Sequence, residues 1–530
     1  MRCARWPSGR SAEMEQTARS FRASLAAMIG ICLVIILIAL DSTVVGTAMP
    51  RIVGELRGYD LYPWIASAYL MGSAVTIPIA GRLGDLYGRK PFVLAAIILF
   101  TATSAACGFA SSMMQLVIAR GLQGVGGGML IGVAFACVPD LFPDRAQRVR
   151  WQVMLSASFG IASAFGPSLG GWLTEHFGWR SVFTINLPVA ALALPAVWRF
   201  LPWIVHHEEG ERSIDWLGAL LLAAAVVMLL LGSEAIQQHG VTHMQGPLLM
   251  LAAIACGAFF VWHQHHSAAP IIPPELFANR DALKLMALGV LTGLSMFVLV
   301  FYSPLLLQGG FGASPKEAGF LMTPLLVCVT VGSIINGRLL PRVPRAERVI
   351  AWGQVGTLVS CLLLTLLDAD SPRWQVLLQF GLCGLSLGFQ LPNLTLQMMA
   401  VAGKRNFGVG SALVQTTRML GSMLGVGIAG VLVNARYAWD VERLLADLPV
   451  RSEVVDALMS SPQILIRVAD QAQLASLASG LGIDSVTLLA QARHALVQGV
   501  HNGFILSAVM AAVSLVISLR LPRYEIAKRS

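Results

Sequence analysis

The stretch ICLVIILIALDSTVVGTAMP, residues 31–50, indicates what class of protein this is, because it runs from apolar residues straight into an acid. No charged residue lies between Arg22 and Asp41, and the next basic residue is Arg51. An apolar stretch of this length can cross about 30 Å of hydrocarbon as a helix. A carboxylate inside such a helix costs at least a few kcal/mol unless it is protonated, hydrated or paired. The stretch therefore predicts a transmembrane helix that carries one functional acid.

The rest of the 530-residue chain has the same apolar character, with 56% hydrophobic and 12% charged residues and a mean hydropathy of +0.70. These values lie outside the range of soluble domains. Apolar runs of roughly 20 residues recur along almost the whole length and leave no room for a large soluble domain. We predict an all-α membrane protein with fourteen spans, centred near residues 35, 72, 101, 125, 161, 192, 224, 256, 295, 326, 358, 387, 422 and 510.

The basic residues indicate the orientation of these spans. Most of the 37 Lys and Arg residues fall in segments that face the cytoplasm if the N-terminus is inside, as short cytoplasmic loops prefer. The net charge of +9 is therefore a sign of topology and gives no support to nucleic-acid binding. Both termini are predicted to be cytoplasmic. The first span is interpreted as a retained helix because no signal-peptide cleavage site precedes it, and Met14 is an alternative start to Met1.

Cysteine and histidine patterns argue against metal chemistry. The eight cysteines are isolated from one another, so neither a disulfide framework nor a CxxC metal site is predicted. The sequence HQHH at 263–266 is the only histidine cluster. A solvated helix end is favoured over a metal site there, because no carboxylate or cysteine lies near it in the sequence. We expect no metal and no cofactor.

Two features describe the organisation of the chain. The sequences GRLGDLYGRK (81–90) and GRLLPRVPRAER (337–348) each end an apolar span, a faint internal repeat of the kind found in transporters built from two helical halves. Pro341 stands where the first copy has Asp85, so only the first copy keeps the acid. The segment 437–499 is polar with Leu, Ala and Val patterning, which predicts short amphipathic helices that cap the outer face. A role in handling substrate is the alternative.

Four motifs occur in order, each at the expected end of its span: LDSTVVGTAMP (40–50), GRLGDLYGRK (81–90), RGLQGVGGG (120–128) and GPSLGG (166–171). Together they resemble the major facilitator superfamily, and the last is similar to the signature of its proton-coupled antiporters. The sequence GWRSVFTINLP (178–188), the IDWLG at 214–218 and the span count resemble its fourteen-helix drug:proton antiporter branch. The pattern departs from the family at Gly46, Thr47 and Ala162.

The resemblance implies a major facilitator fold, with two six-helix bundles and two inserted transmembrane helices near 213–235 and 246–265. It also implies alternating access, in which proton entry drives the substrate out. The predicted division is a cytoplasmic tail at 1–23, an N-terminal bundle at 24–203, the inserted helices at 204–270, a C-terminal bundle at 271–521 and a second cytoplasmic tail at 522–530.

Asp41 and Arg120 are the candidates for proton coupling. At 1.5 Å per residue, Asp41 lies roughly 9 Å and Arg120 roughly 7 Å outward of the membrane midplane. If the two helices are neighbours, Arg120 stabilises the charged carboxylate while burial stabilises the protonated acid, so a change of solvent access can switch the protonation state. We predict that Asp41 carries the coupling proton and that a cationic substrate competes for its charge. An ion pair that only locks two helices is the alternative.

Charged and small residues at 81–90 predict a gating network at the cytoplasmic surface. Two arginines can make charge-assisted hydrogen bonds to the one acid, and glycines allow close helix approach. Such a network can latch the inner side shut, whereas the alternative is a basic loop that only sets topology. Its predicted members are Gly81, Arg82, Gly84, Asp85, Gly88 and Arg89.

The antiporter motif predicts a hinge or seal between the two bundles. Its proline removes one backbone donor and favours a bend, while its glycines make a smooth surface for close packing. Plain helix packing is the alternative. The predicted residues are Gly166, Pro167, Gly170 and Gly171.

Three further polar residues fall inside predicted spans. Gln123 shares a helix face with Arg120, one turn away. Arg418 shows a similar pattern, but the sequence identifies no partner for it. Glu234 lies near the outer end of the seventh span and is either a second proton or cation site or an interfacial acid.

We predict a proton-coupled exporter of amphipathic small molecules, hydrophobic or cationic, in the cytoplasmic (inner) membrane. Its partners are the substrate, protons and the lipid bilayer, with a periplasmic adaptor protein as a further candidate. An exporter of a lipid, siderophore or other metabolite is the alternative on the same scaffold. A membrane-embedded enzyme would need a catalytic cluster at one depth, and the sequence offers none. A channel would pass its substrate independently of a proton gradient.

Overall fold

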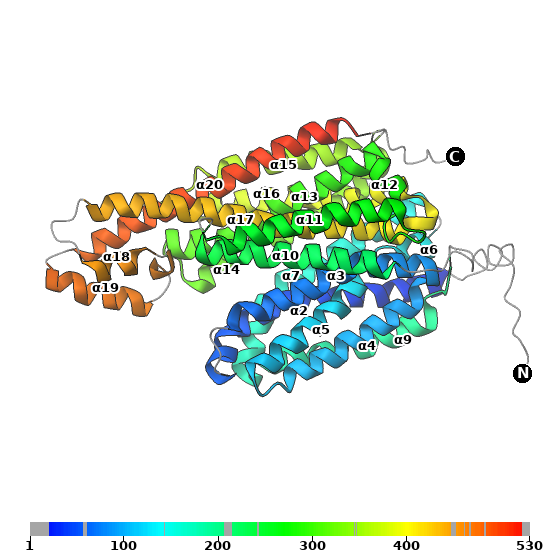
Figure 1. Cartoon of the computed structure of the whole chain (residues 1–530), viewed down its shortest axis with the longest axis horizontal. Coiled ribbons are helices and arrows are strands. Elements are labelled where there is room, and N and C mark those ends of the chain that lie inside the picture. The colour runs from blue at the N-terminus through cyan, green and yellow to red at the C-terminus, as the bar shows by residue number, and fades with distance from the viewer. Residues whose placement is uncertain are drawn as a thin grey trace, which may run out of the picture.

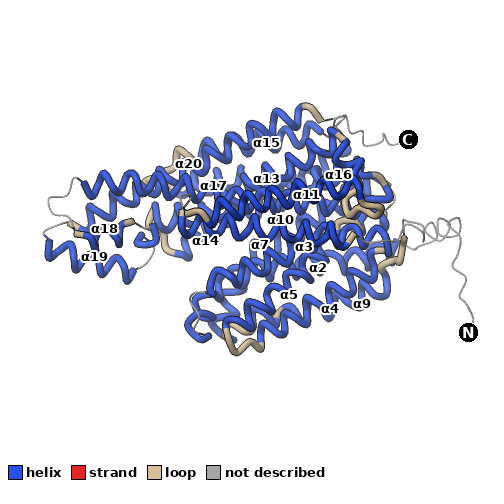
Figure 2. Tube along the Cα trace, in the orientation of Figure 1, coloured by secondary structure: helices blue, strands red, loops and turns tan. Residues whose placement is uncertain are grey.

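The computed structural model describes residues 21–521, apart from 57–60, 143, 206–214, 241–242, 344, 346, 447–451, 461, 466–467 and 482–483. Its described part is helical and contains no strand (Figure 2). The predicted N-terminal tail up to residue 20, the tail at 522–530 and the choice between Met1 and Met14 lie outside the described residues.

Helices of the first half form one bundle, blue to cyan in Figure 1. Polar caps and glycines set their ends: Ser112 and Asp144 cap helices through their side chains, and Gly88, at φ 88°, joins two helices in a conformation that side chains disfavour. The elements are α2 (Phe21–Leu56), α3 (Tyr62–Tyr87), α4 (Arg89–Gly108), α5 (Met113–Ala134), α6 (Cys137–Leu141), α7 (Arg145–Phe177), α8 (Ser181–Thr184) and α9 (Asn186–Phe200).

Helices of the second half form a bundle beside the first (Figure 1). They are α12 (Pro274–Ala278), α13 (Arg280–Leu305), η3 (Leu306–Gly310), α14 (Pro315–Leu339), η4 (Leu340–Arg342), α15 (Glu347–Leu364), α16 (Arg373–Ala402), η5 (Lys404–Asn406), α17 (Phe407–Ala446) and α20 (Ser485–Leu519). Two inserted helices, α10 (Trp216–His239) and α11 (Gln245–His266), come between the halves in sequence, as predicted.

Within the described residues, thirteen helices are long and apolar enough to cross a membrane. The number becomes fourteen if α7, which bends by 46° between Gly166 and Ser168, counts as one span. Pro167 lies at this bend, where its missing N–H weakens the helix. The prediction of an all-α multi-pass membrane protein is confirmed.

The internal repeat seen in the sequence places equivalent glycines at the contact between the halves. Gly81 of α3 touches α17, where an added Cβ would lie 2.6 Å from the Ala412 side chain. Gly337 of α14 touches α7, where an added Cβ would lie 3.0 Å from the Val153 side chain. Small residues permit this close helix approach without a bulky side chain between backbones. The two halves are therefore joined by two similar crossings.

The inserted pair lies along the seam between the halves. Helix α10 packs on α11 and contacts both α3 of the first half and α17 of the second. The Ser233 hydroxyl donates to the Met423 carbonyl of α17 at 3.3 Å. In Figure 1, α10 and α11 run across the front of the second half.

The segment 437–499 contains the predicted short helices, but only in its middle part. Helix α17 continues to Ala446 and α20 already begins at Ser485, so both extend beyond the other helices at the end of Figure 1 opposite α6. Buried apolar residues continue along both extensions, which keeps them paired as one two-helix stalk; these residues are Tyr437, Val441, Leu445, Leu488, Ala492 and Leu496. The short helices α18 (Glu453–Met459), η6 (Pro462–Leu465) and α19 (Val468–Leu481) cap the stalk.

Two exposed residues, one before α17 and one in α19, offer a direct test of orientation. Lys404 and Ser476 are both exposed, the first beside the start of α17 and the second on the cap of the stalk. We expect a membrane-impermeant maleimide added outside cells to label a Ser476→Cys variant and not a Lys404→Cys variant, with the native cysteines removed. Lys404→Cys should react only after permeabilisation. The reverse pattern would overturn the predicted topology.

Candidate functional site

A buried carboxylate, Asp41 of α2, lies at the centre of a polar cluster in the first half. It is 1% exposed. Arg120 Nη1 lies 2.6 Å from one carboxylate oxygen and forms an ion pair with it. The other oxygen accepts hydrogen bonds from Gln123 Nε2 at 2.8 Å and from Asn186 Nδ2 at 3.1 Å. The structure thus brings together Asp41 and Arg120, which the sequence analysis paired by depth, and Gln123, which it placed on the same helix face as Arg120.

The helices position this cluster through small residues. Arg120 and Gln123 lie one turn apart on α5, and Gly124 beside them lets α3 approach so closely that an added Cβ would lie 2.2 Å from the Tyr69 carbonyl. The Arg120 guanidinium therefore stacks on the Tyr69 ring at 4.3 Å and donates from Nε to the Ile65 carbonyl at 3.3 Å. Arg120 has alternative acceptors on α3 if its carboxylate partner is lost.

A second layer of hydrogen bonds holds the amides in place. Ser104 Oγ of α4 accepts from Gln123 at 3.1 Å and from Asn186 at 2.9 Å. It donates to the Phe183 carbonyl of α8 at 2.9 Å. The cluster thus joins six helices, α2, α3, α4, α5, α8 and α9, and both amide donors to Asp41 are themselves oriented by a serine. The sequence analysis did not identify Ser104 or Asn186, although an asparagine at the start of the apolar run NLPVAALAL was a usable signal.

The second half has an uncharged polar cluster on its equivalent helices. Gln354 of α15 donates to Thr292 of α13 at 3.3 Å, and Gln390 of α16 donates to Thr357 at 2.8 Å. All four side chains are buried. A cluster of amides and hydroxyls cannot exchange a proton as a carboxylate can, so of these two clusters only the one in the first half contains an acid.

Asp85 joins the two halves at the predicted inner end. Its carboxylate accepts from the backbone N–H groups of Gly408 at 2.8 Å and Val409 at 2.9 Å. These are among the first residues of α17, where unsatisfied N–H groups and the helix dipole favour a negative charge. Arg89 Nη2 lies 2.8 Å from the same carboxylate. Asp85 is therefore a charged cap that crosses from one half to the other.

The other predicted gating residues surround this cap. Arg89 also pairs with Asp140 of α6, an acid that the sequence analysis did not identify. Arg82 Nη1 donates to the Asn406 side chain of the second half at 3.4 Å. Gly88 packs on Trp203, which leaves no room for a Cβ, while the surroundings of Gly84 are of ordinary van der Waals distance. The predicted network exists as a set of contacts; its role in gating stays a prediction.

The antiporter motif lies within the first half rather than between the halves. Cβ atoms on Gly166 and Gly170 would lie 1.8 Å and 2.5 Å from the Thr43 and Thr47 hydroxyls of α2. Gly171 faces open space. The second half repeats this packing, since Gly421 and Gly425 of α17 touch α13 in the same way. A hinge at Pro167 stays a prediction. Gly166 and Gly170 pack on α2 of the same half, so their contacts do not form a seal between the two bundles.

The histidine cluster has a carboxylate partner that the sequence analysis missed. Asp215 caps α10 by accepting from the Gly218 N–H at 2.8 Å, and it also lies 2.9 Å from His263 Nε2 and 2.7 Å from Gln264 Nε2. Burial opposes ionisation of Asp215, but these hydrogen bonds outweigh it and hold the pKa of that carboxyl below its usual range. No group of three metal-ligating side chains occurs among the described residues. Asp215 therefore links the start of α10 to the end of α11.

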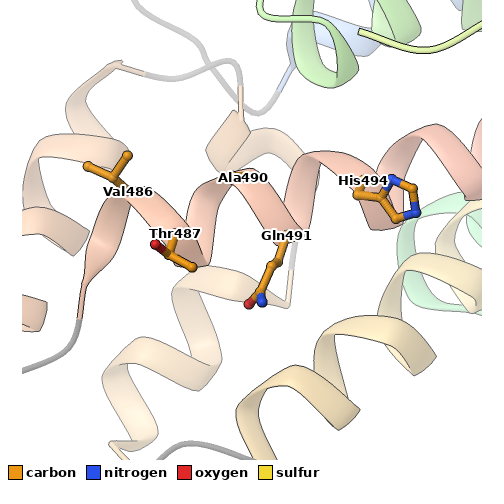
Figure 3. Close-up of a pocket in the computed structure, with 5 residues that line it drawn as sticks. All are labelled: Val486, Thr487, Ala490, Gln491 and His494. Atoms are coloured by element: carbon orange, nitrogen blue, oxygen red, sulfur yellow. The ribbon is translucent and has the colours of Figure 1, made fainter. Parts of the chain in front are cut away.

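Glu234, Arg418 and a surface pocket on α20 lie apart from the Asp41 cluster. Glu234 of α10 is partly buried and contacts Ser67 of α3. Arg418 of α17 is partly buried. A cavity of about 410 Å³ lies on the stalk, lined by Val486, Thr487, Ala490, Gln491 and His494 of α20 (Figure 3). The residues that line it include no carboxylate and belong to the stalk, so the candidate functional site is the Asp41 cluster with the Asp85 cap.

Comparison with known proteins agrees with this geometry. Residues 31–426 match the Major Facilitator Superfamily. The chain is 35% identical over 408 residues to the Multidrug transporter protein MdtP of Bacillus subtilis (strain 168), covering 77% of this chain and 75% of that one. It is 31% identical over 423 residues to Multidrug resistance protein 3 of the same strain, covering 79% and 81%.

Solved structures support the fold. The chain is similar to the human organic anion transporter MFSD10 (TETRAN) with a TM-score of 0.59 over 92% of this chain and 99% of that chain, at 14% sequence identity. At this identity the likeness concerns the fold alone. The family match, the relatives and the fold agree: the chain belongs to the major facilitator superfamily, as a multi-pass membrane transporter and not an enzyme.

Proposed function

We propose that this protein exports amphipathic small molecules across the cytoplasmic membrane in exchange for protons, by alternating access. The observation that carries the proposal is Asp41, a carboxylate buried in a membrane helix and balanced by one arginine. Intramembrane acids with a named partner mark proton or ion pathways. The relatives named as multidrug transporters support drug export as the direction of transport.

Protonation of Asp41 would change the forces between helices. In the present arrangement Arg120 and two amides compensate the carboxylate charge. A proton on Asp41 removes that charge and leaves Arg120 bound to Gln123 Oε1, at 2.8 Å, and to the Ile65 carbonyl. The attraction between α2 and α5 then weakens, and the two helices can shift relative to each other. Proton binding and helix movement are thereby coupled at one residue pair.

The contacts between the halves suggest which side is closed. Gly81, Asp85 and Gly408 hold α3 against the start of α17, and Gly337 holds α14 against α7. With both termini in the cytoplasm, these contacts lie at the inner side. Export requires that they separate to admit the substrate and re-form before it leaves outward.

Asp85→Asn is expected to reduce the initial rate of transport several-fold without changing membrane insertion. Asparagine keeps one acceptor for the two N–H groups of α17 but loses the charge that binds Arg89 and favours the helix N-terminus. The measurement is uptake by everted vesicles at matched expression. Asp144→Asn is the matched control, because that exposed carboxylate only caps α7 and asparagine caps equally well. Normal transport in Asp85→Asn would reduce the motif to a topology signal.

Uptake by everted vesicles also tests the function as a whole. Vesicles that contain the protein should accumulate fluorescent amphiphiles when an inward-acid pH gradient is imposed and release them when the gradient is collapsed. Vesicles with empty membranes are the control. Accumulation that ignores the gradient would reject proton coupling, and the absence of any transported amphiphile would reject drug export in favour of a specific metabolite.

A further inference from the structure

Arg418 is a charged side chain within a membrane-spanning helix for which the described residues supply no partner. It lies eleven residues into α17, about 16 Å from the first residue of that helix. Arg89 and Arg120, the buried arginines of the first half, are each paired with aspartate. Arg418 makes neither a hydrogen bond nor an ion pair with any described residue and remains partly exposed. A guanidinium stays charged in a protein, so at this depth it requires water or an acceptor.

Other polar side chains share a helix face with Arg418. Ser411, Gln415 and Ser422 are spaced from it by multiples of a helical turn, so all four lie on one side of α17. The amide oxygen of Gln415 is buried and has no hydrogen-bond partner among the described residues. Two groups on one face, a donor and an acceptor, are thus left without protein partners. Buried polar groups in proteins are normally satisfied.

The remaining faces of α17 are occupied by neighbouring helices. Gly408 and Ala412 pack on α3 of the first half. Gly421 and Gly425 pack on α13, where an added Cβ on Gly421 would lie 1.9 Å from the Val290 carbonyl. At about 100° of rotation per residue, the polar face falls between these two contacts. It therefore points between α3 of the first half and α13 of the second.

Asp41 is not available to a substrate in the same way. Its side chain is sealed at 1% exposure, and each of its oxygens already accepts from a donor of the protein. In this conformation Asp41 has no exposed surface that a cationic substrate could reach, so competition for its charge stays a prediction. Of Asp41 and Arg418, the partly exposed group is Arg418.

We propose that Arg418 binds an anionic oxygen of the transported molecule, so that the substrates include amphiphiles with a carboxylate or similar acid group. Gln415 lies one turn away, and its amide oxygen, which is buried in this conformation, can accept a second hydrogen bond from an N–H or O–H group of the same molecule once the halves separate. The inference rests on the proposed export function and assigns a substrate class to it. A charge-assisted hydrogen bond in a partly dry site contributes enough to change affinity by about tenfold or more.

The test compares two xanthene dyes, one with a free carboxylate and the other its methyl ester, by fluorescence anisotropy with the purified full-length protein in detergent. Arg418→Gln should weaken binding of the acid by about tenfold or more and leave the ester unchanged. Arg418→Lys should retain part of the preference, since it keeps the charge but not the planar donor pair. Arg348→Gln, an exposed arginine at the start of α15, is the control and should change neither dye.

If Arg418→Gln weakened the binding of both dyes equally, or of neither, the assignment would be overturned. A purely structural arginine does not distinguish an acid from its ester. Intact ester binding by Arg418→Gln shows that this variant is folded. A lipid phosphate is the other source of an anionic oxygen. If acid binding disappears in nanodiscs containing phosphatidylglycerol but persists in phosphatidylcholine, Arg418 belongs to lipid and the substrate assignment fails. Acid-selective binding without any pH-driven transport would reject proton coupling and leave this assignment in place.

Discussion

Asp41→Asn is expected to abolish export driven by a pH gradient while leaving the protein in the membrane. Asparagine has nearly the same shape and can still accept from Gln123 and Asn186, but it cannot bind or release a proton. The side chain at position 41, which faces Arg120, then stays neutral throughout the transport cycle. The expected result is accumulation at the level of empty vesicles under an imposed gradient, measured as dye uptake at matched expression.

Loss of the carboxylate also has a structural cost that must be separated from loss of coupling. Removing one partner of a buried ion pair costs about 3–5 kcal/mol, because the other charge stays buried. Arg120 keeps the Ile65 carbonyl, the Gln123 side chain and the Tyr69 ring, which lowers this cost. The double variant Asp41→Asn, Arg120→Gln removes both charges and should recover thermal stability without recovering coupling.

Two further variants complete the test of Asp41. Asp41→Glu keeps a titratable acid and should retain part of the pH-driven transport, whereas Asp281→Asn, a partly exposed acid paired with Lys284, should behave as wild type. The hypothesis of an ion pair that only locks two helices makes the opposite prediction. Under it, Asp41→Asn would still concentrate dye against its gradient in response to an imposed pH difference.

The depth of charged residues in the membrane could be predicted from the sequence because a helix rises by a constant 1.5 Å per residue. Asp41 and Arg120 were placed at similar depths from their positions in two spans, and the structure brings them together. Ser104 was not identified because uncharged polar side chains are common in membrane helices and give no signal of their own, whereas Asn186, at the start of an apolar run, gave a usable signal that was overlooked. Their importance comes from the packing of α4 and α9 around α5, which no local pattern contains.

Contacts between distant segments were the main source of error. The sequence analysis found no acid beside the histidines at 263–266, because Asp215 lies 48 residues away from His263 and meets it only when the hairpin closes. The short helices of segment 437–499 were predicted from its polar residues with Leu, Ala and Val patterning, but the extension of α17 and α20 into both ends of this segment was not predicted. In the structure those polar residues are the exposed faces of α17 and α20, which continue as a pair past the membrane-spanning part.

Cross-linking α7 to α14 is expected to arrest transport completely and reversibly. A Cβ on Gly337 would lie 3.2 Å from the Val153 Cβ, a few tenths of an ångström below the range that disulfides prefer, roughly 3.5–4.5 Å. The variant with Val153→Cys and Gly337→Cys, in a background without the native cysteines, should therefore form a disulfide under a membrane-permeable oxidant. The measurement is dye export before oxidation, after oxidation and after reduction.

Arrest by this bond would follow from the position of the two residues rather than from damage to the transport site. Val153 and Gly337 belong to different halves, and neither takes part in the hydrogen bonds or the ion pair of Asp41. If the halves must part here for the substrate to enter, a covalent bond stops the cycle in the closed-inside state, and dye binding from outside survives. Each single-cysteine variant should be unaffected by oxidant. Full export by the oxidised double variant, with the disulfide verified by mass spectrometry, would mean that the contact of α7 and α14 stays closed throughout transport and that the substrate takes another route.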